Sequence, residues 1–386
     1  MRKRICVIID HMEQGGVSSS VVNFCKHATM LGYEVDFLDM SATSSAFSPS
    51  VKILSLKGLS RYWNLTARTY KRQPLYKQIL LFPLAMMKFA TNRYGIWLKL
   101  ILGNLNNEKY DCVFAYNQCA PCYYFALNCV RARKKIAVIH GDINFMGDIS
   151  TWSPLLSYFD QIACVSKSVS MGFVKKFPKL SSKFCSLYNM FDIASIQQMS
   201  QASPPFLFDK SKINIISISR HDNQYKGVHR IPEICASLLA SSITDFHWYV
   251  VGGGPDFEAN CKYSDDLDVS SFLTFCGPLD NPFPLLSQSD FLVLTSYTEA
   301  YSMALKEAHV LNIPTIAAYY PGIEEAIQDK VNGLIAEQSI ESLTEKIADM
   351  ILNRDNIRSS LSDNLKRSQF SNDLAYTQLK NIIEQD

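Results

Sequence analysis

Short apolar runs alternate with longer mixed segments along the first half of the chain. Most of the mixed segments are long enough to form a helix. Apolar runs of this length are typical of buried strands, and strands that alternate with helices indicate a doubly wound, largely parallel α/β sheet. The strands predicted in this half are Ile5–Ile9, Val35–Leu38, Val51–Leu56, Cys112–Tyr116, Ile136–Ile139, Ile162–Val165 and Phe184–Leu187.

The alternation pauses at residues 199–212, where Gln201–Pro205 has the composition of an interdomain linker. It then resumes, and the residues after Ser339 have a helical pattern. A chain of 386 residues is long enough to bury two cores. We therefore expect two Rossmann-like domains that face one another across a central cleft. The strands predicted in the second domain are Ile213–Ser219, His247–Val251, Phe272–Cys276, Phe291–Thr295 and Thr315–Ala317.

Two carboxylates, Glu299 and Glu307, stand eight residues apart and follow the apolar run Phe291–Thr295. The residues before Glu307 are good helix formers, so Glu299 is expected just before a helix and Glu307 about two turns along it. The free backbone N–H groups of residues 300–303 would then suit an anion such as a diphosphate. A carboxylate on each side of that anion can bind sugar hydroxyls. This arrangement predicts a nucleotide-sugar site.

Arg220 and Lys226 follow the first predicted strand of the second domain. They therefore stand at the carboxyl end of a strand, where ligands of open α/β sheets bind. A diphosphate leaving group gains negative charge as the glycosidic bond breaks, and fixed cations or a metal must stabilise it. The two side chains are candidates for those cations. The alternative is a pair of surface cations in a loop.

The net charge of +2 hides an uneven distribution. Residues 1–203 hold 24 Lys and Arg against 11 Asp and Glu, whereas the remainder holds 14 against 25. Between Met40 and Asn107 there are ten basic residues and no acidic one, interleaved with aromatic and aliphatic side chains. This mixture suits an anionic membrane surface. Solvated helices are the ordinary alternative, and nucleic acid is disfavoured because no nucleic-acid-binding motif accompanies the charge.

No run of about 18 apolar residues occurs, so a membrane-spanning helix is not expected. The basic opening resembles the start of a signal peptide, but Asp10, His11 and Glu13 interrupt it, and a buried first strand explains it better. The eleven cysteines are scattered, mostly within apolar runs, which favours a reducing compartment. We expect a cytoplasmic protein that lies peripherally on the inner face of the cytoplasmic membrane.

The spacing of the two glutamates resembles the E-x7-E motif of retaining glycosyltransferases with the GT-B fold, glycosyltransferase family 4 or group 1 glycosyl transferases. The segment Ser219–Gly227 resembles the family's G-R-x-x-x-x-K-G sequence. The matches cover nearly the whole chain and are densest over residues 213–335. Further matches, in the family's order, are Gly15-Gly16 after the first strand, Pro314–Ala317, Pro321–Glu325 and Val331–Leu334.

The resemblance implies a role for each matched residue. The two basic residues would bind the diphosphate, Glu307 the ribose hydroxyls and Glu299 the transferred sugar. His140 matches an N-domain histidine that contacts the donor sugar, with a purely structural histidine as the alternative. The implied catalytic residues are His140, Arg220, Lys226 and Glu299, and the implied donor-binding residues are Gly15, Gly16, Arg220, Lys226, Gly277, Glu299, Ala300, Tyr301, Ser302, Met303 and Glu307.

Three positions depart from the family's pattern. Ala300 and Tyr301 replace the usual glycine and phenylalanine, and Ser219 replaces a common glycine. None of these changes removes a charged group, so they bear on the identity of the donor sugar more than on activity. The resemblance also implies an acceptor-binding domain at 1–203, a nucleotide-sugar domain at 204–365, and a last helix at 366–386 that crosses back to the first domain.

Three other motifs have ordinary explanations. Asp266-Leu267-Asp268 has the form of a manganese-binding DxD motif, but it lies in a charged stretch without a phosphate-binding context. Cys119 and Cys122 form a lone CxxC without a second pair or a nearby histidine. Gly252-Gly253-Gly254 lacks the spacing of a nicotinamide-binding loop.

The function expected from the sequence is that of a metal-independent retaining glycosyltransferase. Its donor would be a UDP- or GDP-linked sugar, with no further cofactor. Its acceptor would be a glycan, which we expect to be a lipid-linked intermediate of bacterial surface polysaccharide. The alternatives are an epimerase or phosphorylase of the same fold and a catalytically silent scaffold that binds sugar nucleotides. The four intact charged residues, Arg220, Lys226, Glu299 and Glu307, argue against the scaffold.

Overall fold

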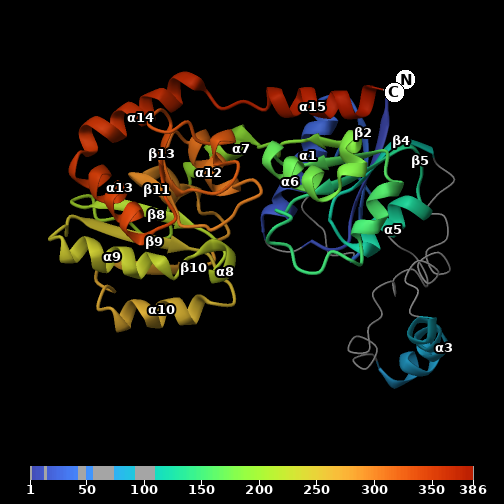
Figure 1. Cartoon of the computed structure of the whole chain (residues 1–386), viewed down its shortest axis with the longest axis horizontal. Coiled ribbons are helices and arrows are strands. Elements are labelled where there is room, and N and C mark those ends of the chain that lie inside the picture. The colour runs from blue at the N-terminus through green and yellow to red at the C-terminus, as the bar shows by residue number, and fades with distance from the viewer. Residues whose placement is uncertain (1, 13–14, 42–48, 55–73, 92–108, 386) are drawn as a thin grey trace. The chain divides into compact units, whose positions relative to one another are not determined.

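Two parallel sheets form the framework of the protein (Figure 1). The computed structural model describes residues 2–12, 15–41, 49–54, 74–91 and 109–385. The chain forms two compact units, of which unit 1 comprises Met1–Val165, Ser170–Met190 and Asp373–Asp386, and unit 2 comprises Ser166–Val169 and Phe191–Asn372. The divisions therefore fall at 190/191 and 372/373, whereas the sequence placed them at 203/204 and 365/366. The roles expected of the two domains stay predictions.

Unit 1 contains a seven-stranded sheet in the order β3-β2-β1-β4-β5-β6-β7, and every pairing in it is parallel. Its strands are β1 (Arg4–Ile9), β2 (Glu34–Asp39), β3 (Lys52–Leu54), β4 (Lys109–Ala115), β5 (Arg131–Ile139), β6 (Gln161–Cys164) and β7 (Phe184–Ser186). The helices are α1 (Gly16–Met30), α3 (Leu75–Thr91), α5 (Ala120–Asn128), α6 (Lys167–Lys176, whose first residues are grouped with unit 2) and α15 (Asp373–Glu384), with 3₁₀ turns η2 (Ser153–Tyr158) and η3 (Pro178–Lys183).

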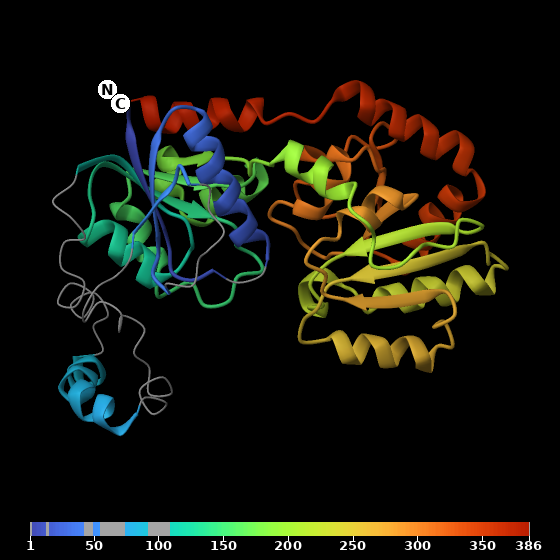
Figure 2. The ribbon, with the colours of Figure 1, turned by 180° about the vertical axis from the view of Figure 1, so that it is seen from behind.

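The C-terminal helix α15 is part of the core of unit 1. Its residues Leu379 and Ile383 pack with α1 and with alternate residues of β1, because successive side chains of a strand point to opposite faces. The Tyr376 hydroxyl lies 2.7 Å from His27 Nδ1 of α1. Lys3 Nζ donates to the Ile383 carbonyl at 3.1 Å, so the two ends of the described chain lie side by side (Figures 1 and 2).

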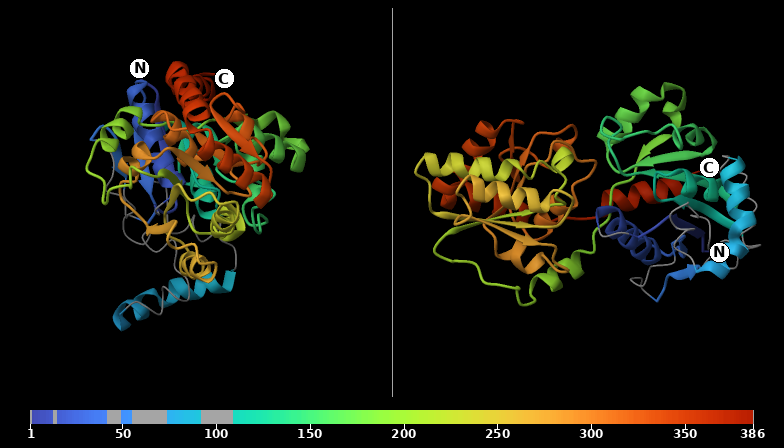
Figure 3. Two further views of the ribbon diagram at one scale, coloured as in Figure 1. Left: turned by 90° about the vertical axis from the view of Figure 1, so that its left-hand side faces the viewer. Right: turned by 90° about the horizontal axis from the view of Figure 1, so that it is seen from below.

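Unit 2 contains a six-stranded parallel sheet in the order β10-β9-β8-β11-β12-β13, shown from two further directions in Figure 3. Its strands are β8 (Ile213–Ile218), β9 (Phe246–Val251), β10 (Leu273–Gly277), β11 (Phe291–Leu294), β12 (Thr315–Ala318) and β13 (Gly333–Ala336). The helices are α7 (Ile193–Ser200), α8 (Asn223–Lys226), α9 (Arg230–Ala240), α10 (Phe257–Asp266), α11 (Phe283–Gln288), α12 (Met303–Val310), α13 (Ile340–Leu352) and α14 (Arg354–Ser368), with the 3₁₀ turn η4 (Ile323–Glu325).

The two faces of the second sheet bury different helices. Odd-numbered residues of β8 and β11, such as Ile215 and Val293, pack against α9 and α13. Their neighbours Ile216 and Leu292 pack on the opposite face against α11 and α12. The near-continuous apolar runs of the sequence follow from this, because a strand covered on both faces needs apolar residues at every position.

The predicted fold class is confirmed, and all twelve predicted strands occur. The strand that the sequence analysis missed is β13, because Gly333–Ala336 is short and begins at a glycine. It pairs with β12 at the edge of the sheet. Most of the basic, acid-free segment between Met40 and Asn107 lies outside the described residues.

Helix α3 is the longest described part of that segment. Five large apolar side chains in its first turns are exposed: Leu75, Tyr76, Ile79, Leu80 and Phe82. No helix among the described residues has both the length and the apolar character needed to cross a bilayer.

Candidate active site

The strand order of unit 2 reverses between β8 and β11, which lie side by side. The chain leaves β8 toward β9 on one side and leaves β11 toward β12 on the other. In open α/β sheets, ligands bind at such a reversal, in the crevice outside the carboxyl ends of the two strands. The loop after β8 carries Arg220 and Lys226, and the loop after β11 carries Glu299. The structure thus brings together three of the predicted site residues.

Backbone contacts join these two loops. The Tyr297 N–H donates to the Tyr225 carbonyl at 2.9 Å, and the Thr295 hydroxyl donates to the Lys226 carbonyl at 3.1 Å. Gly227 has a φ of 58°, and a Cβ there would lie 2.5 Å from the Thr295 carbonyl oxygen. Only glycine permits this approach without strain. The Lys-Gly pair of the motif therefore holds Lys226 against the loop that carries Glu299.

Lys226 and Glu299 form an ion pair. Lys226 Nζ lies 2.6 Å from Glu299 Oε2, and the Ser296 hydroxyl donates to Glu299 Oε1 at 2.8 Å. The Glu299 side chain is only 9% exposed, so the pair is largely shielded from water. Arg220 is exposed and makes no side-chain hydrogen bond or ion pair with any residue that the structure describes. The site therefore holds one cation paired with a carboxylate and one cation open to solvent.

The glycines 252–254 hold the Arg220 loop in place. The Ser219 N–H donates to the Val251 carbonyl and the His221 N–H to the Gly253 carbonyl, each at 2.9 Å. A Cβ on Gly252 would lie 1.9 Å from the Ser219 carbonyl oxygen. The spacing of these glycines disfavoured a nicotinamide site, and no other role was predicted for them. They bring two loops close together at the crevice.

Arg230 anchors the other loop and was missed by the sequence analysis. It is 2% exposed. Its Nη1 donates to the Thr295 carbonyl at 2.9 Å and to Gln338 Oε1 at 2.8 Å, and its Nη2 donates to the Gln338 carbonyl at 2.8 Å. The guanidinium also lies 4.9 Å from the centre of the Tyr297 ring. Because Gln338 Nε2 donates to the Ser296 carbonyl at 3.0 Å, the two side chains together clamp residues 295–297.

Helix α12 begins at Met303, three residues later than expected. Residues 299–302 form a bend in which Ser302 has extended backbone angles. The Lys226–Glu299 pair holds one end of this bend, and Tyr301 packs against Phe191 with ring centres 6.3 Å apart at the other. These contacts outweigh helix propensity. The expectation that N–H groups of residues 300–302 belong to the first turn of the helix is therefore wrong.

Glu307 lies on α12, as expected, but about one turn after the helix begins and not two. Burial raises the pKa of its carboxyl to about 7. A partly protonated carboxyl beside a crevice can accept hydrogen bonds from hydroxyls once it is ionised. Perturbed pKa values of this kind gather at functional sites.

The predicted donor-binding residues around α12 differ in how they are placed. The side chains of Tyr301 and Met303 pack against an apolar cluster that contains Phe191 and Val310, so any contact with a donor would come from their backbone. Ser302 is buried and is the N-cap residue that precedes the helix, and Ala300 lies in the bend. Gly277 ends β10 with a φ of 70° and accepts a hydrogen bond from the Gly252 N–H at 2.9 Å.

The remaining predicted site residues, Gly15, Gly16 and His140, belong to unit 1. Gly15 precedes α1 with a φ of 151°, and Gly16 is the first residue of the helix. Both are exposed, and a Cβ on Gly15 would meet no atom of the described residues within 4 Å. The exposed glycine backbone leaves room for a ligand, and the predicted ligand contact of this loop stays a prediction.

His140 directly follows β5, at the same sheet edge. Burial lowers the pKa of its ring to about 4, so the ring is neutral at pH 7. Its backbone N–H donates to Gln118 Oε1 at 3.0 Å, and its Nε2 is buried without a hydrogen-bond partner among the described residues. The site role and the structural role of this histidine both stay open.

A polar cluster that the sequence analysis did not identify stands between these elements, at the ends of β1 and β4. Asp10 Oδ2 lies 2.7 Å from His11 Nδ1, and Asn117 Nδ2 donates to Asp10 Oδ1 at 2.6 Å. Its sequence signal was the pair of polar residues directly after an apolar strand.

The DxD motif lies at the end of a helix: Asp266 ends α10, and Asp268 follows two residues later with a φ of 55°. Over the residues that the structure places, no three His, Cys, Asp or Glu side chains gather where they could hold a metal.

Comparison with known proteins agrees with this geometry. Residues 200–368 match the family model described as "Glycosyl transferases group 1". The chain is 26% identical over 227 residues to N-acetyl-alpha-D-glucosaminyl L-malate synthase of Bacillus anthracis, covering 56% of this chain and 58% of that protein. It is 23% identical to the lipopolysaccharide core biosynthesis glycosyltransferase LpsE of Rhizobium meliloti over 50% of this chain and 54% of that one. The matches thus span about half the length of these relatives.

A third relative is N,N'-diacetylbacillosaminyl-diphospho-undecaprenol alpha-1,3-N-acetylgalactosaminyltransferase of Campylobacter jejuni, 27% identical over 42% of this chain and 40% of that protein. Among solved structures, a point mutant of TarM from S. aureus, in complex with Fondaparinux, alpha-GlcNAc-glycerol and UDP, superposes with a TM-score of 0.73. That match has 14% sequence identity and covers 99% of this chain and 100% of TarM. At that identity the likeness shows the fold alone.

Proposed function

Because residues 200–368 match the group 1 glycosyl transferases, we propose that this chain is a retaining enzyme that moves a sugar from a nucleotide-diphosphate sugar to a glycan acceptor. The observation that carries the proposal is the grouping of Arg220, Lys226 and Glu299 at the reversal of strand order, with Glu307 on the helix that follows. Cations suit a diphosphate, and carboxylates suit the hydroxyls of ribose and of a sugar.

The Lys226–Glu299 pair suggests how the donor enters. In the proposed sequence the diphosphate lies against Arg220 and draws Lys226 away from Glu299. The Glu299 carboxylate, still held by Ser296, then accepts hydrogen bonds from the sugar hydroxyls. As the bond from the sugar to the diphosphate breaks, the two cations stabilise the charge that develops on the leaving group. No metal is needed in this scheme.

Retention would follow if the acceptor hydroxyl attacks from the face that the diphosphate leaves, through an oxocarbenium-like state. A UDP-sugar is the first donor to test, because a protein of the same fold was solved with UDP. A GDP-sugar is the second. The donor-binding roles of Gly15, Gly16 and His140, which belong to unit 1, stay predictions.

A lipid-linked glycan is the proposed acceptor, with the protein acting at the inner face of the cytoplasmic membrane in the assembly of bacterial surface polysaccharide. One relative is named for an undecaprenol-linked substrate and another for lipopolysaccharide core biosynthesis. Helix α3 adds exposed apolar side chains to a segment rich in Lys and Arg. Apolar side chains beside basic ones suit the headgroup region of an anionic membrane.

The test is the release of UDP or GDP from a panel of nucleotide sugars in the presence of bacterial lipid extract. Arg220→Ala and Lys226→Ala should each lower turnover by roughly 10²–10³. Lys262→Ala, an exposed lysine on α10, is the matched control and should leave the rate unchanged. Near wild-type rates in both site variants would refute the assigned roles, and loss of wild-type activity in EDTA would refute metal independence.

A further inference from the structure

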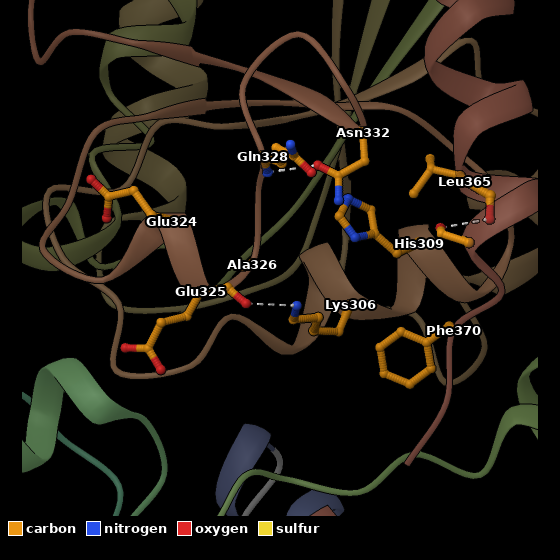
Figure 4. A pocket seen from close by; sticks show the side chains of 10 residues that line it. Lys306, His309, Glu324, Glu325, Ala326, Gln328, Asn332, Leu365 and Phe370 are labelled. Atoms are coloured by element: carbon orange, nitrogen blue, oxygen red, sulfur yellow. Dashed lines mark hydrogen bonds between the residues drawn. The ribbon is translucent and has the colours of Figure 1, made fainter. Parts of the chain in front are cut away.

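A second hollow lies in unit 2, beside α12 and η4 and bordered by the end of α14 (Figure 4). Its volume is about 250 Å³, which is several times the roughly 30 Å³ that one water occupies in the liquid. The side chains of Arg220, Lys226, Glu299 and Glu307 do not line it. Its lining residues are Lys306, His309, Glu324, Glu325, Ala326, Gln328, Asn332, Leu365, Ser368 and Phe370.

The ammonium group of Lys306 has few hydrogen-bond acceptors at this hollow. Its Nζ makes one hydrogen bond, to the Glu325 carbonyl at 3.4 Å, and lies 5.9 Å from the centre of the Tyr301 ring. Of the carboxylates that the structure describes, none forms an ion pair with it. Burial lowers the pKa of Lys306 to about 8, and the Glu325 carboxylate opposes that shift. A largely buried ammonium group with one long hydrogen bond favours an anionic partner.

His309 also lacks a hydrogen-bond partner for one of its ring nitrogens. It is 5% exposed, and its Nε2 has no hydrogen-bond partner among the residues described. Burial, and after it the charge of Lys306, lower the pKa of the ring to about 3, so the ring is neutral and can donate one N–H. In Figure 4 its ring lies beside the Asn332 side chain at the hollow.

Asn332 contributes a further donor. Its Oδ1 accepts a hydrogen bond from the Gln328 N–H at 2.8 Å, and its amide NH₂ lies beside the His309 ring in Figure 4. The side chains of Glu324 and Glu325 extend to the opposite side from Lys306 and His309 (Figure 4). Lys306, His309 and Asn332 therefore offer N–H groups to the hollow, and the two glutamate carboxylates extend away from them.

We propose that this hollow binds a small oxyanion, a carboxylate or a phosphate, through Lys306, His309 and Asn332. The oxyanion supplies the acceptor oxygens that Lys306 Nζ and His309 Nε2 lack. Since Lys306 and Glu307 are neighbours on α12, a bound anion would stabilise the helix that carries a proposed ribose-binding residue. The site itself does not depend on the proposed transferase activity.

The test is a thermal unfolding series of the full chain with sodium phosphate, with sodium acetate, and with sodium chloride at matched ionic strength. Phosphate or acetate should raise the melting temperature of the wild type with concentration, and chloride should not. The rise should persist in Arg220→Ala, which disables the donor site, and in the control Lys262→Met. It should disappear in Lys306→Met. A response to one anion alone identifies whether the site takes phosphate or carboxylate.

Two outcomes would overturn the proposal. One is the absence of a rise with either anion. The other is a rise that survives in Lys306→Met and disappears in Arg220→Ala, because the anion would then lie in the donor site. If Lys306→Met does not fold, the ring resonances of His309 in histidine-labelled wild type decide the matter. They should shift on addition of the anion that raises the melting temperature, and unchanged resonances would refute the site.

Discussion

Glu307 is a carboxyl that the fold keeps in an unfavourable environment. Its pKa rises from 4.5 to about 7 on folding, so the folded protein holds a proton that the unfolded chain releases. The resulting contribution to stability is fully present below pH 4.5 and is lost as the pH rises through 7. Glu307→Gln removes this dependence. The melting temperature of the variant relative to wild type should therefore be higher at pH 8 than at pH 5.

Glu345→Gln, an exposed change on α13, is the control for that experiment and should show no such trend. A difference between Glu307→Gln and wild type that stays constant from pH 5 to pH 8 would contradict the raised pKa.

Substitutions of the two glutamates of the motif should affect different quantities, one the affinity for the nucleotide and the other kcat. Glu307→Gln should weaken the binding of free nucleoside diphosphate, because its proposed partners are ribose hydroxyls. Glu299→Gln should lower kcat and leave that affinity nearly unchanged, because its proposed partners lie on the transferred sugar. Calorimetric titration with UDP or GDP, together with initial rates, measures both quantities. The opposite pattern would show that the two roles are exchanged.

At the scale of elements, the loop between β11 and α12 depends on an anchor from α9. Arg230→Met keeps most of the side-chain volume and removes the guanidinium, so the Thr295 carbonyl and both carbonyl oxygens of Gln338 lose this donor. Each buried polar group left unsatisfied costs about 1–3 kcal/mol, so the free energy of unfolding should fall by that order. The kcat should fall as well, because Glu299 loses its position. Arg230→Lys should not restore either value, because an ammonium group lacks the planar fork of the guanidinium.

Arg358→Met provides the comparison, since Arg358 pairs with Asp290 away from the crevice. It should lower stability and leave kcat unchanged. If Arg230→Met behaved in the same way, Arg230 would stabilise the fold without positioning the catalytic loop.

At the scale of the whole molecule, the uneven charge predicts binding to anionic membranes. The protein should sediment with vesicles that contain anionic lipid and not with neutral ones, and salt should weaken the binding. Each Lys or Arg near such a surface contributes about 1 kcal/mol. Changing Lys77 to Gln together with Arg68, Lys71 and Arg72, which lie outside the described residues, should release the protein from the vesicles.

The exposed apolar residues of α3 allow a second version of this test. Ile79→Ser with Leu80→Ser should weaken vesicle binding, whereas Leu207→Ser, at an exposed apolar residue in unit 2, should not. If vesicle binding is equally strong in the basic and the apolar variants, the segment does not bind the membrane, and the alternative interpretation as solvated helices holds.

The sequence by itself determined the fold class and the series of strands. Apolar runs and helical segments are local patterns, because the side-chain period of a strand or helix depends only on neighbouring residues. The residues of the candidate site were also readable, since Arg220, Lys226, Glu299 and Glu307 stand in recognisable motifs directly after strands. Parallel strands place such residues at one edge of a sheet.

Only the tertiary structure decided how those residues are held. Arg230 and Gln338 stand 108 residues apart, and Lys226 and Glu299 stand 73 apart, so neither pairing leaves a local pattern. The start of α12 at Met303 depends on contacts with Lys226 and Phe191, which outweigh the helix propensity of the segment. The hollow around Lys306 and His309 arises in the same way, because burial is set by the packing of elements that are distant in sequence.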